Sequence, residues 1–347
     1  MTTQGDRAQD SESKALAIFS HGELIGDAMT KLPFVAALRA TFPDWRIVWI
    51  ATESSALESA AAPLIPGAID AFHCGAGWGQ SAADLAKPPP TPERFALVID
   101  TQNLWWRSLL VRRLKADRFV SSIAGYRFSS GKPAQERRNP RHVVDRLFSL
   151  LEAAAGAPQP RPRLRDCVTV PEAAAIEAAR LLPTGPAYVA LAPGAGKRVK
   201  CWPLDRFIEV ARRQQAQGRA PVFLLGPGEA EWRAPLAEAV PGALFPLQAE
   251  GLDNDGPRYT PVRTVAAARR CAAALSGDCG LGNMIAAADI PLVSLFGPTS
   301  GAKLHPKVTA GAWLQAQDFG GDGGMAAIPV DAAAEAVEKL LREAKPI

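Results

Sequence analysis

The chain has 347 residues, which is enough for two domains, and 48% of them are hydrophobic while 21% are charged. This balance is typical of a globular protein and excludes an intrinsically disordered chain. The net charge of +4 is modest but uneven, because residues 105–146 contain eleven Lys or Arg against three Asp or Glu. Such a segment fits an anionic partner, either a phosphorylated substrate or a membrane surface, and a solvated basic face is the alternative.

Other features of the composition exclude several classes of partner. No basic-aromatic stacking motif accompanies the basic segment, so we expect no nucleic-acid partner. The five Cys include no C-x-x-C pair, which argues against a zinc knuckle or a disulfide framework and favours the cytoplasm. No apolar run approaches the roughly 18 residues of a membrane helix. We therefore expect a cytoplasmic protein, with peripheral contact with the inner membrane as an open alternative.

From residue 15 onwards, apolar strand-like runs alternate with helix-like segments. Residues 1–14 are polar and lack the apolar stretch of a signal peptide, so we expect a disordered tail there. Helical segments follow the first and the third of the predicted strands, which lie at 15–20, 45–52 and 95–101. This alternation predicts a parallel sheet with helices on both faces, in an N-terminal domain that spans residues 15–160.

The alternation is interrupted in the middle of the chain and then starts again. Pro158, Pro160 and Pro162 stand at alternate positions, which stops a helix and favours an extended linker at 157–166. A C-terminal domain is predicted over 161–330 and a last helix over 331–347. The expected strands and helices of the C-terminal domain lie at 187–193, 203–218, 220–227 and 230–240, followed by a helix and a strand at 262–278 and a strand at 290–299. The sequence thus predicts an α/β protein with two doubly wound units.

Two acidic residues follow predicted strands. In "HGELIGDAMTKLP", Gly26 relaxes the turn after the first strand and Asp27 stands at the start of a helix. Asp27 either caps that helix, which is the simpler interpretation, or faces a ligand beyond the strand end. In "LLGPGEAEW", Glu229 either contacts ribose hydroxyls or merely favours a helix N-terminus. Both positions lie where ligands bind in open α/β sheets.

A basic, glycine-rich loop follows the first strand of the second unit. The stretch "LAPGAGKRVKCWPLDRF" places Lys197, Arg198 and Lys200 shortly after two glycines at a strand end. It lacks the Walker A pattern, so its phosphate chemistry is of another kind. A surface loop without a ligand is the alternative interpretation.

The stretch "SGDCGLGNMIAAADIPLVSLFGPTS" at 276–300 combines a strand end with an immediate helix start. Helix N-termini bind diphosphates through their free N–H groups, and Gly280 and Gly282 would allow a close approach. The carboxylate of Asp278 would repel a phosphate, so it fits sugar hydroxyls or an ordering role in the loop. A glycine-rich turn without a ligand is again the alternative.

Taken in chain order, these segments resemble the lipopolysaccharide heptosyltransferases and related enzymes of glycosyltransferase family 9, which have the GT-B fold. "ELIGDAMTKLPFVAALRATFPDWRIVWI" resembles the family's opening strand, Gly-Asp turn and helix, and "FALVIDTQNLWWRSLL" is similar to its "D-L-V-I-D-L-Q" strand and helix. "KCWPLDRF" resembles its Lys-x-Trp-Pro motif. "LLGPGEAEW" and the segment from Ser276 resemble its two nucleotide-sugar segments. The resemblance extends from about Ala15 to Leu341.

The resemblance implies an N-terminal domain for the acceptor, a C-terminal domain for the nucleotide-sugar donor, and a central cleft between them. It implies Asp27 as the catalytic base, and the helix at 331–347 would pack back toward the N-terminal domain. The implied donor-binding residues include a phosphate-binding Lys200, a ribose-contacting Glu229 and Asp278 in the sugar-diphosphate loop; the full set is Gly194, Lys197, Lys200, Glu229, Asp278, Gly280, Leu281, Asn283 and Thr299. The implied acceptor-binding residues are His21, Gln102 and Arg107.

The expected function is the inverting, metal-independent transfer of a sugar, such as heptose from ADP-heptose, to a lipopolysaccharide core or a related glycan or glycolipid. No cofactor is expected, because the nucleotide-sugar is a substrate. His21 stands where the family often has Arg or Lys, and Asn283 stands where it commonly has His; an Asn carries no charge. The alternative is a non-catalytic nucleotide-sugar-binding protein that partners another transferase. A nicotinamide-dependent oxidoreductase would need a dinucleotide fingerprint that the sequence lacks.

Overall fold

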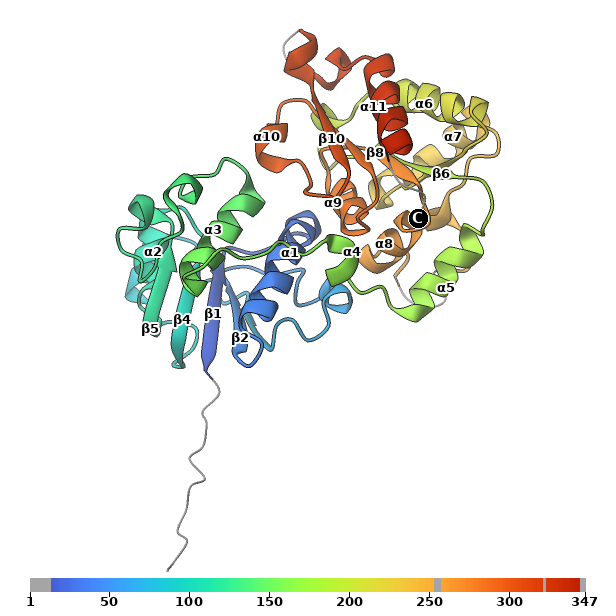
Figure 1. Cartoon of the computed structure of the whole chain (residues 1–347). Coiled ribbons are helices and arrows are strands. Elements are labelled where there is room, and N and C mark those ends of the chain that lie inside the picture. Colours follow the sequence, from blue (N-terminus) through green and yellow to red (C-terminus); the bar gives the residue numbers. More distant parts are fainter. Residues whose placement is uncertain (1–13, 253–256, 321–322, 344–347) are drawn as a thin grey trace, which may run out of the picture.

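The computed structural model describes residues 14–252, 257–320 and 323–343, so all but the last residue of the tail expected at 1–14 lies outside the described residues. Two parallel five-stranded sheets, each flanked by helices, form the two halves of the molecule (Figure 1). The first sheet has the order β3-β2-β1-β4-β5, and its strands are β1 Ala15–Ser20, β2 Arg46–Ala51, β3 Ala71–Cys74, β4 Arg94–Asp100 and β5 Lys115–Ser121. The predicted fold class, two doubly wound α/β units, is confirmed.

The second sheet repeats this design. Its order is β10-β9-β8-β6-β7, and all its neighbouring strands are parallel. Its strands are β6 Tyr188–Ala192, β7 Ala220–Phe223, β8 Ala273–Gly277, β9 Leu292–Phe296 and β10 Gly311–Gln315. The residues of β6, β8 and β9 are buried throughout, as expected of strands covered on both faces, and this is why they were recognisable as apolar runs.

Helices cover both sheets and connect the parallel strands. The expected linker at 157–166 is irregular up to residue 163 but ends in the short helix Leu164–Cys167 (α4), so the prediction of an extended segment is wrong for residues 164–166. The helix that begins at Trp105 is short: it ends at Val111, and β5 begins at Lys115. The helices are α1 Ile25–Thr41, α2 Trp105–Val111, α3 Val143–Ala155, α4 Leu164–Cys167, α5 Glu172–Leu181, α6 Leu204–Ala216, α7 Arg233–Ala239, α8 Pro261–Ala268, α9 Gly280–Ala287, α10 Gly301–Leu304 and α11 Val330–Glu343.

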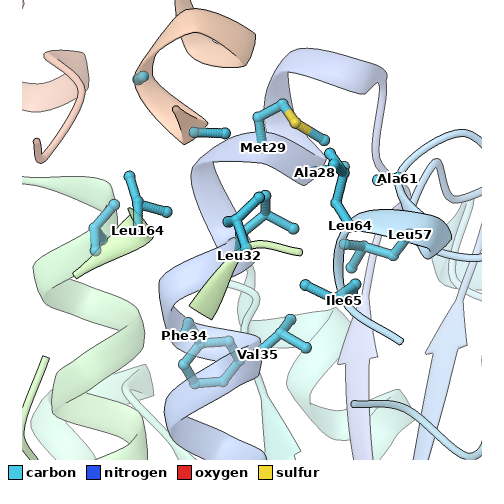
Figure 2. Close-up of a cluster of buried hydrophobic side chains, with 14 of the residues drawn as sticks. Ala28, Met29, Leu32, Phe34, Val35, Leu57, Ala61, Leu64, Ile65 and Leu164 are labelled. Carbon is cyan, nitrogen blue, oxygen red and sulfur yellow. The ribbon is translucent and has the colours of Figure 1, made fainter. Parts of the chain in front are cut away.

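The two halves meet where α1 packs against α9, and the short helix α4 contacts both (Figure 1). Buried side chains from both halves belong to one continuous hydrophobic cluster, which includes Leu32 of α1, Leu164 of α4 and Ile285 of α9. Figure 2 shows Leu32 lying between Leu164 on one side and Leu64 on the other. The contact between the domains is therefore apolar at its centre.

At the N-terminal ends of α1 and α9, the two helices approach backbone to backbone. A Cβ atom added at Gly26 would lie 3.0 Å from Cα of Gly280 and 3.3 Å from Nδ2 of Asn283. A side chain at position 26 would force one of the two helices to shift, so this close approach favours glycine there. The crossing also brings the loop after β1 next to the loop after β8.

The last helix differs from the expectation drawn from the resemblance. In its described part, α11 packs against α6 and against strands of the second sheet, so the prediction that it packs toward the N-terminal domain is wrong for these residues. The physical reason is its apolar stripe: Ala333, Val337 and Leu340 follow helical spacing and are buried in the core of the C-terminal domain. The remainder of the predicted helix, residues 344–347, lies outside the described residues.

No helix within the described part of the chain combines the length and the apolar character that crossing a bilayer requires.

Candidate active site

Two adjoining pockets lie at the carboxyl ends of the strands, around the crossing of α1 and α9. The first, which we call the Asp27 pocket, has a volume of about 460 Å³. Six predicted site residues line it: His21, Asp27, Gln102, Lys200, Asp278 and Asn283. Three of them come from the N-terminal domain and three from the C-terminal domain, so the pocket exists only because the domains face each other.

Asp27 is the third residue of α1, and its side chain is exposed toward this pocket. Leu24 occupies the N-cap position without a side-chain hydrogen bond, so the interpretation of Asp27 as the helix cap is wrong. With the described residues, the Asp27 carboxylate forms neither a hydrogen bond nor an ion pair. It is therefore available to accept a proton from a bound hydroxyl group.

Opposite Asp27, a cation and a carboxylate from separate loops of the C-terminal domain form a pair. Lys200 Nζ donates a hydrogen bond to Asp278 Oδ2 over 2.7 Å, and Thr299 donates to the same oxygen. The side chain of Lys200 is 28% exposed and that of Asp278 is 15% exposed. The cation is thus held in place while it still faces the pocket, which suits the binding of a diphosphate.

The second pocket, the Glu229 pocket, has a volume of about 500 Å³ and is lined by residues that include Gly194, Glu229, Gly280 and Leu281. The backbone N–H of Gly226 donates a hydrogen bond to the Glu229 carboxylate over 3.2 Å. Partial burial raises the pKa of the Glu229 carboxyl above its usual value. A carboxylate held in this way can accept hydrogen bonds from vicinal hydroxyls such as those of a ribose.

The N-terminus of α9 separates the two pockets. Cys279 is the N-cap, and its Sγ accepts a hydrogen bond from the backbone N–H of Gly282 over 3.3 Å. A Cβ at Gly282 would lie 2.3 Å from Oγ of Ser276, which explains why a larger residue has no room there. The first turn of α9 thus lies between the two pockets: Gly280 and Leu281 line the Glu229 pocket, and Asn283 adds an amide to the Asp27 pocket. The N-terminal end of a helix carries a partial positive charge.

Three predicted site residues do not line either pocket. Arg107 instead donates a hydrogen bond to Gln102 Oε1 over 3.2 Å, so it orients a pocket residue. Thr299 acts in the same indirect way through Asp278. Lys197 is exposed and lies outside both pockets.

Beneath Gln102, Asp100 supports the same wall of the Asp27 pocket. Its carboxylate accepts hydrogen bonds from Ser108, Ser121 and the backbone N–H of Gln102, the last over 2.9 Å. Burial raises the pKa of the Asp100 carboxyl to about 6, although these hydrogen bonds oppose the change.

The structure also shows pocket residues that the sequence-based set lacks. Lys31 lines the Asp27 pocket one helical turn after Asp27, and it forms an ion pair with the buried Glu23. Burial opposes ionisation of Glu23, but the nearby charge and hydrogen bond of Lys31 lower the pKa of the Glu23 carboxyl below its usual value. The polar spacing in "HGELIGDAMTK" was a usable signal, because Asp27 and Lys31 are four residues apart in a helix.

In the Glu229 pocket, the sequence-based set of site residues lacks two aromatic residues, and it lacks Arg198, which the sequence indicated only as one cation of the basic loop. Trp232 and Tyr259 line this pocket, and so does Arg198. Aromatic side chains are common in pockets that bind planar groups such as nucleobases. Tyr259 belongs to none of the motifs described above, so its position in the pocket was not predictable from the sequence.

Among the described residues, no group of three or more His, Cys, Asp or Glu side chains could hold a metal ion. Whether transfer depends on a metal ion is untested by this finding, so metal independence stays a prediction.

Several solved structures have the same architecture as this protein. The structure is similar to that of a family 9 glycosyltransferase from Veillonella parvula, with a TM-score of 0.71 and 19% identity over 95% of this chain and 98% of the other. It is similar to the E. coli ADP-heptose lipopolysaccharide heptosyltransferase II, with a TM-score of 0.64 and 17% identity over 95% and 99% of the two chains. At these identities the likeness shows the fold, and it confirms the GT-B prediction.

A third similar structure is the E. coli heptosyltransferase WaaC with ADP, with a TM-score of 0.65 and 19% identity over 94% of this chain and 99% of the other. No curated protein sequence matches the chain. The model of one protein family, glycosyltransferase family 9 (heptosyltransferase), matches residues 92–312, which is more than half of the chain. The chain therefore belongs to glycosyltransferase family 9, a family of glycosyl-transferring enzymes.

Proposed function

We propose that this enzyme transfers a sugar, with inversion and without a metal ion, from a nucleoside-diphosphate sugar to a hydroxyl group of a glycan or glycolipid acceptor. The observation that supports this best is the Asp27 pocket itself. The Asp27 carboxylate, which has no partner among the residues that the structure describes, comes from one domain and shares this pocket with Lys200 and with Asn283 in the first turn of α9, both from the other domain. These are the groups needed to remove a proton and to stabilise a departing diphosphate.

In the proposed mechanism, the acceptor hydroxyl hydrogen-bonds to Asp27. As its oxygen attacks the anomeric carbon, the bond from that carbon to the diphosphate breaks, and Asp27 takes the proton. General base catalysis of this kind contributes about 10²- to 10⁴-fold to a rate. Attack from the face opposite the leaving group gives inversion in a single displacement.

Charge that develops on the leaving diphosphate falls within reach of Lys200 and the N–H groups at the start of α9. These groups are already oriented, so stabilising that charge requires no large reorganisation. The Glu229 pocket, which adjoins the same helix end, would hold the nucleoside, with the Glu229 carboxylate on the ribose hydroxyls and the aromatic residues beside the base.

We propose an ADP-linked sugar as the donor and heptose as its first candidate. Support comes from the family and from a similar structure named as heptosyltransferase WaaC with ADP. A lipopolysaccharide core or a related glycan is the corresponding acceptor. His21 and Gln102 would contact this acceptor, since both line the N-terminal side of the pocket.

The first experiment is a thermal-shift panel with ADP, UDP, GDP and CMP on the wild-type protein and on Lys200→Ala. A ligand at about 100 times its Kd stabilises a protein by about 2.7 kcal/mol. We expect ADP to raise Tm by several degrees, and we expect Lys200→Ala to reduce that shift. The transfer reaction is then measured with ADP-heptose in the presence of a chelator.

The matched variant for this experiment is Asp27→Asn, which preserves shape and removes the base. We expect it to retain the ADP shift and to lose at least about 100-fold in turnover. Full turnover in Asp27→Asn would remove this residue from the mechanism. The non-catalytic alternative, which Asn283 favours because it cannot carry charge, predicts ADP binding by the wild type with no transfer to any acceptor.

A further inference from the structure

A third pocket, which we call the basic pocket, adjoins the Asp27 pocket and belongs to neither substrate site assigned above. Its volume is about 500 Å³. Four of its lining side chains are cations, and none of its lining residues is acidic. The cations are Arg138, Arg141 and Arg146 of the N-terminal domain and Lys303 of α10 in the C-terminal domain.

None of these four side chains forms an ion pair or a hydrogen bond with the described residues. Neighbouring cations do: Arg137 forms an ion pair with Glu152, and Arg161 forms one with Asp145. The Nε of Arg138 is buried and has no hydrogen-bond acceptor. A buried donor without a partner is unfavourable, and converging positive charges repel each other. An anion in this pocket would remove both penalties.

One wall of the basic pocket is a backbone segment in an unusual conformation. Ala124, Gly125 and Tyr126 follow one another with φ angles of 52°, 62° and 66°. Such strain persists only where the surrounding structure enforces it, and it is concentrated at ligand sites. The ring of Tyr126 is buried and anchors the segment, so this wall is fixed before a ligand arrives.

The basic pocket is continuous with the Asp27 pocket. Asn103, Val143, Arg146 and Leu304 line both of them. A ligand that reached from one pocket into the other would therefore have one end beside the cations and a neighbouring group beside Asp27. This continuity connects an anion site to the acceptor side of the reaction.

We propose that the basic pocket binds a phosphate monoester carried by the acceptor. At pH 7 such a group carries a charge of about −1.5 to −2 and has three strong acceptor oxygens, so it can satisfy several cations at once. An Arg side chain can bind a phosphate or a carboxylate through two parallel hydrogen bonds. A single carboxylate has only two oxygens, so it could bind just one of the three arginines in this way. The link to the acceptor rests on the proposed function, whereas the anion site itself rests on the pocket.

The phosphate can belong to a soluble sugar phosphate or to a lipid at a membrane surface, and two binding measurements separate these sources. The first is calorimetric titration with glucose 6-phosphate in the presence of saturating ADP, which keeps the phosphate out of the proposed donor site. The second is sedimentation with phosphatidylcholine vesicles that contain or lack phosphatidic acid. Both are made at low and at high salt.

The test variants are Arg138→Gln/Arg141→Gln and, from the other domain, Lys303→Gln. Charge-assisted hydrogen bonds to phosphate are strong enough that we expect the double variant to weaken phosphate binding about tenfold or more. The control is Arg127→Gln, because Arg127 is exposed nearby but lies outside the basic pocket. We expect the control to bind as the wild type does. Unchanged thermal unfolding shows that the variants are folded.

If the test variants, but not the control, bind glucose 6-phosphate more weakly than the wild type does, the proposal is supported and the phosphate is that of a soluble compound. If they lose binding only to the vesicles with phosphatidic acid, the proposal is supported and the phosphate is that of a lipid. The proposal is overturned if the wild type binds neither, if the test variants bind as the wild type does, or if Arg127→Gln is equally weakened. Thermal shifts with ADP, recorded on the same proteins, distinguish a failure of this proposal from a failure of the proposed function. Absence of an ADP shift in the wild type counts against the proposed function and leaves the phosphate result valid.

Discussion

At the scale of single residues, the contact between Gly194 and Glu229 determines where the donor-side carboxylate lies. A Cβ added at Gly194 would lie 2.3 Å from the Glu229 carboxyl carbon, so no other residue leaves Glu229 in its place. We expect Gly194→Ala to push this carboxylate out of the Glu229 pocket and to weaken ADP binding about tenfold. Calorimetric titration with ADP measures the effect.

The control for this variant lies two residues further along the same loop. Gly196 also lines the Glu229 pocket, but a Cβ there would meet nothing within 4 Å. We expect Gly196→Ala to bind ADP as the wild type does. Equal affinities in both variants would show that the position of Glu229 does not matter for the nucleotide.

His142 makes a contact that depends on its charge. Its Nδ1 accepts a hydrogen bond from the backbone N–H of Val144, and its Nε2 donates one over 2.7 Å to the backbone oxygen of His305 in the other domain. Burial lowers the pKa of His142 to about 4, and the nearby charge of Lys307 adds to this change. The hydrogen bond to the His305 backbone and, more weakly, the charge of Asp145 oppose it. The pKa of the facing His305 is also lowered by burial.

From this pKa we predict the direction of a pH effect. In the unfolded chain the His pKa is about 6.5, so between that value and about 4 the folded state binds fewer protons. The contribution of His142 is therefore complete above about pH 6.5 and is lost as the pH falls toward 4, at about 1.4 kcal/mol for each unit between the two pKa values.

The matched variant is His142→Asn, which can still cap α3 but does not titrate. We expect the wild type to lose free energy of unfolding relative to this variant as the pH is lowered from 7.5 to 4.5, because other titrating groups cancel in the difference. Denaturant unfolding at several pH values measures it. A difference that stays constant with pH would contradict the assignment of a neutral, buried His142.

At the scale of elements, the crossing of α1 and α9 can be tested with two similar variants. Ala favours a helix over Gly by about 1 kcal/mol in helix interiors. In Gly280→Ala the new Cβ would lie 3.7 Å from its nearest neighbour, an ordinary contact, so we expect an unchanged or higher Tm. In Gly26→Ala the new Cβ would lie 3.0 Å from a backbone atom of Gly280, which cannot rotate away. We therefore expect Gly26→Ala to have the lower Tm, and equal values would refute the close approach.

The elements also show what the sequence could and could not predict. Strands buried on both faces, such as β1 and β8, were predictable because every residue is apolar or small. Three strands at the edges of the sheets, β3, β5 and β10, were not predicted. The strand β5, for example, begins with "KADR", which is not an apolar run. The docking of α11 was also beyond the sequence, because an apolar stripe predicts burial but not the partner.

At the scale of the whole molecule, one hydrophobic cluster joins the two domains. Because the domains share this core, we expect calorimetry to show a single unfolding transition. Leu32→Ala, which removes a fully buried side chain at the junction, is expected to cost about 2–5 kcal/mol and to lower that single Tm. Two separate transitions, with only one of them shifted by Leu32→Ala, would show instead that the domains unfold independently.

For the site as a whole, strand-end positions and motif order were sufficient to predict which loops gather at the cleft. They brought Asp27, Lys200 and Asp278 into one pocket, as the structure shows. The basic pocket was not predictable in the same way. Its cations come from an irregular segment, from α3 and from α10, and only the packing of the two domains shows that Arg138 and Lys303 face the same space.

The glycine contact between α1 and α9 has a consequence for motion. If the domains rotate about this contact, each atom moves in proportion to its distance from it, as along a lever. Asp27 is adjacent to Gly26 and Asp278 is two residues from Gly280, so their separation would change little. The contact between His142 and His305 lies elsewhere along the junction of the domains. Such a pivot would admit a large acceptor at the outer rim while it preserved the spacing between base and leaving group.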